Sequence, residues 1–139
     1  FQKSLFALHA LSIKVIVHLI LGLPHETREM MSASVQAIAN LPVWGIKLQL
    51  LHVLSGTDLA AYYEKTHFPV FSMDEYCEMI IDCLELLPPE MVIHRITGDG
   101  PKDLLIAPMW STGKRTVLNQ IHRRLKERNT YQGRLATKR

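Results

Sequence analysis

The fold is predicted by residues 13–21, whose sequence is IKVIVHLIL. This run is rich in β-branched residues and almost continuously apolar, which is typical of a strand buried on both faces of a parallel sheet. The segments GIKLQLLHV at residues 45–53 and MVIHRI at residues 91–96 are predicted as the second and third strands. We therefore expect three main strands.

Helical patterns fill the segments between these strands. Thr27 is placed to cap a helix that carries apolar residues at helical spacing and ends at Asn40 and Pro42. Thr57 is placed to cap a short helix that extends to Tyr63. Each hydroxyl can accept a hydrogen bond from an unpaired amide of the first helical turn, so both helices have defined starts.

Two further helices are predicted in the second half of the chain. Ser72 and Glu75 form a capping box, and Pro88 ends the helix that follows it. Either Ser111 or Thr112 is predicted to cap the last helix.

Helix and strand alternate along the chain, from the end of a helix at residues 1–11 to a loop at residues 97–110. This order is typical of right-handed crossovers, so we assign an α/β fold with three main parallel strands flanked by helices. Three strands are few for an independent sheet, which indicates part of a barrel or doubly wound sheet. Residues 1–112 form this part, and residues 113–139 form a C-terminal helix and basic tail, with residues 129–139 expected to be mobile.

Charge is distributed unevenly along the chain, whose formal net charge is +3. Residues 113–139 carry nine Lys or Arg and one acid, whereas residues 1–112 carry seven Lys or Arg and twelve acids. A basic end on an acidic body is typical of a segment that docks on nucleic acid. A terminal helix that pairs with the acidic body is the alternative, and the sequence leaves both open.

The two cysteines, Cys77 and Cys83, are expected to be ordinary helix or core thiols. Their positions on one helix differ by roughly 120° around the axis and about 9 Å along it, which is too far for a disulfide. Their spacing matches no zinc or iron–sulfur pattern, so we expect these residues to hold no metal.

The longest strongly apolar run, residues 15–24, is about half as long as a membrane span and contains His18. A cytoplasmic protein without membrane contact is therefore expected. The chain begins at Phe1 rather than at an initiator Met, so we treat it as a piece of a longer protein.

Ligands of α/β sheets bind at the carboxyl ends of the strands, so the segments after the strands are candidate sites. After the first strand, Gly22 permits a close backbone approach or a left-handed φ, and Pro24 stiffens the turn. A plain strand-to-helix turn would explain the same residues. After the second strand, His52 is either a satisfied core histidine or a ligand or base.

Polar residues gather after the third strand, where His94, Arg95 and Asp99 lie close to two glycines. An Arg and an Asp at a strand end suit a polar or anionic substrate, and a pair that only fastens the loop is equally consistent. The chain contains no nucleophile-elbow, Walker, zinc-protease or dinucleotide-binding motif, so the catalytic residues stay unassigned.

The three segments HLILGLPHET, LLHVLSGT and IHRITGDGP together resemble radical S-adenosylmethionine (SAM) enzymes. The first resembles the Gly-x-Ile-x-Gly-x-x-Glu segment on the fifth strand of that barrel. Residues 5–133 resemble a bacterial branch of iron–sulfur oxidoreductases related to oxygen-independent coproporphyrinogen oxidase and the elongator acetyltransferase. The resemblance implies the C-terminal βα units of a partial TIM-type barrel, whose parent enzyme reductively cleaves SAM to abstract hydrogen from an unknown substrate.

The resemblance also implies roles for five residues in binding SAM. Ile20 matches the apolar side chain that packs on the adenine, and Gly22 with Pro24 shapes the turn beside it. His52 and Val53 match the positions that offer backbone to the adenine edge.

Three features depart from the family pattern. His18 replaces an acid that contacts the ribose in many relatives, and His25 replaces a Gly, which predicts a less tight turn. The CxxxCxxC loop that ligates the [4Fe–4S] cluster is absent, so we expect it upstream of Phe1 and expect this chain alone to be inactive.

Two other functions are kept as alternatives. The chain could be a tRNA-binding module that uses its basic C-terminal helix, or a small structural α/β domain. Because three strands of an incomplete barrel leave two edges and one apolar face open, we also expect self-association, most simply as a two-fold dimer.

Overall fold

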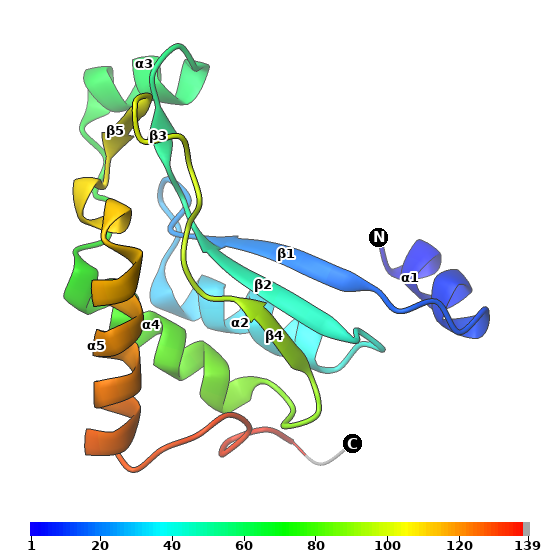
Figure 1. The fold of residues 1–139 in the computed structure, drawn as a ribbon. Helices are drawn as coiled ribbons and strands as arrows, with labels where there is room; N and C mark the ends of the chain where they lie inside the picture. The colour runs from blue at the N-terminus through cyan, green and yellow to red at the C-terminus, as the bar shows by residue number, and fades with distance from the viewer. Residues whose placement is uncertain (138–139) are drawn as a thin grey trace.

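The main sheet is formed by three parallel strands, β1 (Ile16–Leu21), β2 (Gly45–Leu50) and β4 (Val92–Arg95), in the order β1-β2-β4 (Figure 1). The structure is a computed structural model that describes residues 1–137. The strands and the helices that flank them confirm the predicted α/β fold. Strand β1 begins later and β2 ends earlier than predicted, because the apolar runs extend beyond the residues that pair with a neighbouring strand.

The longer helices are α1 (Gln2–Ala10), α2 (Arg28–Ala39), α4 (Met73–Leu86) and α5 (Lys114–Glu127). Helices α2 and α4 pack side by side against one face of the sheet, α5 packs on α4, and α1 stands apart near the N-terminus (Figure 1). Within residues 1–137, no helix packs on the opposite face of the sheet (Figure 1).

Side-chain alternation along the strands separates these two faces. On the face covered by helices, Leu21 and Leu48 are at most 1% exposed. On the open face, Ile16, Ile20 and Val92 are 37–43% exposed. The sheet is therefore buried on one side only within the part of the chain that the structure describes.

A second, smaller unit lies beyond the carboxyl ends of the main strands. Strands β3 (Val53–Leu54) and β5 (Leu105–Ala107) pair antiparallel, and helix α3 (Asp58–Thr66) packs on them around a separate core that includes Phe68 (Figure 1). The prediction of one strand over residues 45–53 was wrong, because the chain leaves the main sheet after Leu50. The predicted loop likewise contains β5 and the start of the short 3₁₀ helix η1 (Met109–Thr112).

The helix caps follow the sequence at three of four starts. The hydroxyls of Thr27 and Thr57 accept hydrogen bonds from the backbone amides of their first turns, and the Ser72–Glu75 capping box is complete. The prediction for α5 was wrong. Its N-cap is Gly113, because the hydroxyls of Ser111 and Thr112 donate to backbone carbonyls within and just before η1.

The basic end of the chain pairs with the acidic side of α4. Arg124 of α5 donates to Asp74 and to Glu78, the latter at 2.7 Å, and Arg128 donates to Glu78 at 2.8 Å. Of the two interpretations of the charge pattern, the structure therefore favours the terminal helix that pairs with the acidic body.

The prediction of a mobile tail was wrong for residues 130–135, because this segment after α5 packs against the end of α4. The amide of Gln132 donates to two backbone carbonyls in the α4–β4 connection, at 2.7 and 2.8 Å. The backbone amides of Gly133 and Leu135 donate to the last turn of α4. Lys138 and Arg139, also part of the predicted basic tail, lie outside the described residues.

Cys77 and Cys83 are free, buried thiols, as predicted. Burial raises the pKa of both, that of Cys83 to about 12, so neither is a ready nucleophile. A search of residues 1–137 finds no helix with the length and apolar character needed to cross a membrane.

Candidate functional site

A shallow pocket of about 290 Å³ lies where the carboxyl ends of the three main strands meet. It is lined by one residue of β1, the end of β2 with the segment after it, and the loop after β4: Ile20, Gln49, Leu50, Leu51, His52, Leu54 and residues 98–101. This pocket brings together three of the residues singled out from the sequence, namely Ile20, His52 and Asp99.

Ile20 contributes an apolar wall to this pocket. Because strand side chains alternate, Leu21 enters the core whereas Ile20 faces the open side, where it is 43% exposed. Its register partner on β2 is Gln49, which also lines the pocket. An exposed apolar side chain beside an amide suits a flat ligand that has both a face and polar edges.

His52 follows β2, and its imidazole lies against the loop after β4. Its Nε2 atom is buried and has no hydrogen-bond partner within residues 1–137. Burial lowers the pKa of His52, while Asp99 raises it and Lys114 lowers it. Burial therefore favours the neutral form of the ring.

Asp99 lies at the edge of the pocket and is bound by two cations. Its carboxylate is 3.4 Å from the guanidinium of Arg95 and also accepts a hydrogen bond from Lys114 at the start of α5. Lys114 thereby lowers the pKa of Asp99. The Arg95–Asp99 pair fastens the loop, as one interpretation predicts, and leaves the Asp99 carboxylate beside the pocket. A role of the pair in binding a polar substrate stays a prediction.

The remaining predicted residues lie elsewhere. His94 and Arg95 line a separate groove of about 530 Å³ between β4 and α5, and the ring of His94 packs on Trp44 with centroids 5.3 Å apart. Val53 is fully buried in β3, where its register partner is Ala107 of β5. A contact between Val53 and SAM stays a prediction.

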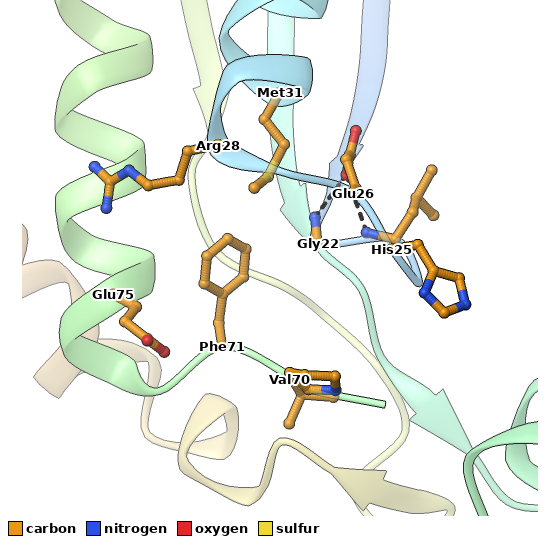
Figure 2. A pocket seen from close by; sticks show the side chains of 10 residues that line it. Gly22, His25, Glu26, Arg28, Met31, Val70, Phe71 and Glu75 are labelled. Atoms are coloured by element: carbon orange, nitrogen blue, oxygen red, sulfur yellow. Dashed lines mark hydrogen bonds between the residues drawn. The ribbon is translucent and has the colours of Figure 1, made fainter. Parts of the chain in front are cut away.

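The turn after β1 is tight and is held by a carboxylate. Gly22 has φ +85°, and a Cβ there would lie 2.8 Å from the ring of Phe71, so both reasons proposed for a glycine hold. The carboxylate of Glu26 accepts hydrogen bonds from the backbone amides of Gly22 and Leu23, each at 3.0 Å (Figure 2). Glu26 thus fixes the backbone conformation at the start of the connection between β1 and α2.

The prediction that His25 loosens this turn was wrong. His25 adopts φ 66°, which is the conformation a glycine would supply, and the backbone amide of Glu26 still donates to Leu23 at 2.9 Å. With Pro24 before it, His25 occupies the position where a type II turn requires a left-handed residue.

A second pocket, of about 400 Å³, lies between this turn and the start of α4 (Figure 2). Met31, Val70 and Phe71 give it an apolar lining. The charged groups around it are engaged, since Arg28 pairs with Asp82 and Glu26 holds the turn. Of the residues predicted to bind SAM, Gly22 lines this pocket and the others do not.

No group of three His, Cys, Asp or Glu side chains within residues 1–137 is placed to hold a metal ion. The described part of the chain therefore offers no ligand set for an iron–sulfur cluster. Its pocket instead offers an apolar wall, a neutral imidazole and closely approaching backbone.

Sequence reasoning missed two features of this site. Lys114 was counted only as part of the basic end, and its distance from Asp99 in the sequence gave no indication of their contact. The two glycines beside Asp99 were noted, but their contact with His52 was not predicted, because glycine spacing does not say which side chain approaches.

The chain is similar to segments of longer proteins. The chain is 50% identical over 121 residues to the uncharacterized protein YtqA of Bacillus subtilis, which covers 87% of this chain and 38% of that protein. It is 32% identical over 132 residues to the uncharacterized protein MJ0486 of Methanocaldococcus jannaschii, covering 94% of this chain and 41% of that protein. The chain thus spans about two fifths of these relatives.

The fold is similar to that of the archaeal Methanocaldococcus infernus Elp3 with an N-terminal deletion, with a TM-score of 0.78 and 18% sequence identity. The match covers 94% of this chain and 30% of that chain. Residues 43–127 match the Radical_SAM C-terminal domain. With three fifths of its length in that match, the chain belongs to the Radical_SAM C-terminal domain family.

Proposed function

We propose that this chain forms the last strands of the barrel of a cytoplasmic radical SAM oxidoreductase and that its pocket binds the adenosine part of SAM. Together, SAM and a [4Fe–4S] cluster supply reductive cleavage of the sulfonium and hydrogen abstraction from a substrate. Family membership supports this class of parent enzyme. The substrate is unassigned.

The observation that carries the proposal is the pocket at the three strand ends. Ile20 offers an apolar face on which a purine ring can pack, and Gln49 and the backbone after β2 lie beside it. Gly98 and Gly100 allow the loop backbone to approach closely. These residues would bind and orient the nucleoside and exclude water from one side of it.

The proposal assigns the ligands of the [4Fe–4S] cluster to residues outside the described part of the chain. Because residues 1–137 hold no set of three suitable ligands, the cysteines must come from another segment of the parent protein. We expect a CxxxCxxC motif there, and we expect the chain alone not to cleave SAM.

The test is anaerobic reconstitution with iron and sulfide, followed by dithionite and SAM, with 5′-deoxyadenosine as the measured product. A longer protein that contains this chain should form it, and the isolated chain should not. Ile20→Asp should abolish formation, because a carboxylate would replace the apolar wall. Ile16→Asp is the matched control, since Ile16 is similarly exposed on the same face at the other end of β1.

Two results would contradict the proposal. The first is product formation by the isolated chain, and the second is an equal effect of the two substitutions in the longer protein.

A further inference from the structure

The two most distinctive motifs of the sequence meet at one side chain. His52 belongs to LLHVLSGT, and the loop after β4 belongs to IHRITGDGP. The imidazole of His52 lies against both glycines of that loop, Gly98 and Gly100. Two segments that are more than 40 positions apart thus form one unit at the pocket.

The contact leaves no room for a side chain on the loop. A Cβ at Gly98 would overlap Cε1 and Nε2 of the His52 ring, and a Cβ at Gly100 would lie 2.7 Å from Nδ1. Neither glycine has a left-handed φ, so the requirement for glycine comes from space rather than from backbone conformation. The ring therefore sets how closely the loop can approach β2.

The same loop is held from its other side by charge. Asp99, between the two glycines, pairs with Arg95 of β4 and Lys114 of α5. Residues 98–101 line the pocket together with Ile20 and Gln49. The position of the loop thus fixes the position of one wall of the pocket.

We propose that His52 is a positioning residue that holds residues 98–101 as one wall of the pocket and thereby sets the affinity of the pocket for the adenosine part of SAM. This inference rests on the proposed function for its ligand. The contact between His52 and the loop can be tested without that ligand.

The charge state of His52 should control this contact. The protonated ring carries an N–H on both nitrogens, and the N–H on the buried Nε2 would have no acceptor within residues 1–137. Burial lowers the pKa of His52 below its ordinary value of 6.5, with Asp99 acting in the opposite sense and Lys114 in the same sense. The packed ring binds fewer protons than a free one, so the contact is strongest above pH 6.5 and weakens as the pH falls below it.

The first experiment uses nuclear magnetic resonance on the full chain without ligand. The amide signals of Gly98 and Gly100 should shift with pH at the same midpoint as the His52 ring, below 6.5. His52→Gln should abolish this titration. Glycine amides that do not follow His52, or that titrate equally in His52→Gln, would overturn the inference.

The second experiment measures SAM binding by calorimetry in a double-mutant cycle. Gly98→Ala should weaken binding about tenfold in the wild-type background and have little further effect in His52→Ala, where the ring no longer blocks the methyl group. Gly113→Ala is the matched control, because its Cβ would meet its nearest neighbour at 3.6 Å. An equal loss from Gly98→Ala in both backgrounds would overturn the inference. Absence of SAM binding in every variant would contradict the proposed function, while the titration still decides the role of His52.

Discussion

The two faces of the main sheet differ in what their side chains contact. The covered face is continuous with a core that includes Leu48 and Leu50, both at most 5% exposed, beneath α2 and α4. The open face carries exposed Ile16 and Ile20, with the polar His18 between them on β1. Such a mixed face is typical of a surface that meets a ligand or another part of a protein, whereas the covered face is a finished core.

The largest expected effect is self-association of the chain through the open face of the sheet. We expect the isolated chain to form a two-fold dimer, because Ile16, Ile20 and Val92 are exposed beside free strand edges. Sedimentation should then give twice the chain mass of 15.9 kDa, and Ile16→Lys should restore the monomer. A wild-type monomer at all concentrations would contradict this prediction and mean that the open face stays exposed to solvent.

One substitution in each face of the sheet tests the difference in burial between the two faces. Leu48→Ala should lower the free energy of unfolding by about 2–5 kcal/mol, because it leaves a cavity in the core. Ile20→Ala, on the neighbouring strand, should cost about 0.5–1 kcal/mol, because that side chain is already 43% exposed. Denaturant unfolding of both variants in the monomeric Ile16→Lys background measures this, and equal costs would mean that another part of the chain covers the open face.

A smaller effect is expected where α5 is fastened to the covered side. Arg124→Ala should cost about 1–2 kcal/mol, because its side chain packs on α4 and its guanidinium pairs with Asp74 and Glu78. Arg115→Ala on the same helix is the control, since Arg115 is exposed and forms no ion pair within residues 1–137. If both variants unfold alike, the ion pairs do not hold α5 in place.

The smallest effect on stability is expected at the edge of the pocket. Asp99→Asn should change the midpoint of thermal unfolding little, because Asp99 is about half exposed, while altering the activity of the longer protein. Lys114 holds the pKa of Asp99 low, so any stabilisation by this pair is present above the ordinary carboxyl pKa of 3.8 and is lost as the pH falls below it. A large loss of stability with unchanged activity would make the pair purely structural.

The sequence predicted the parts of this molecule that depend on local chemistry. The caps at Thr27, Thr57 and Ser72 use hydroxyls close to the amides that they bind, so the pattern alone identifies them. Of the three main strands, the first was predicted from a long apolar run, and the other two from shorter segments that also contain polar residues.

The features that were not predicted depend on distant partners. Strands β3 and β5 have two and three residues, and their pairing joins segments about 50 positions apart, so neither shows a periodic pattern. The contact of His52 with Gly98, and the pairing of Asp99 with Lys114, arise only once the strand ends have been brought together. The sequence indicated which strand ends could form a site but not how they touch.

The packing of residues 130–135 on α4 has a consequence for the order of events during synthesis. The amides of Gly133 and Leu135 bind carbonyls of Leu84 and Glu85, about 50 residues earlier in the chain. Because domains fold as the ribosome releases them, those carbonyls must stay bonded to water until the segment after α5 emerges. The final turn of α4 is thus completed only after α5 and the segment that follows it have been synthesised.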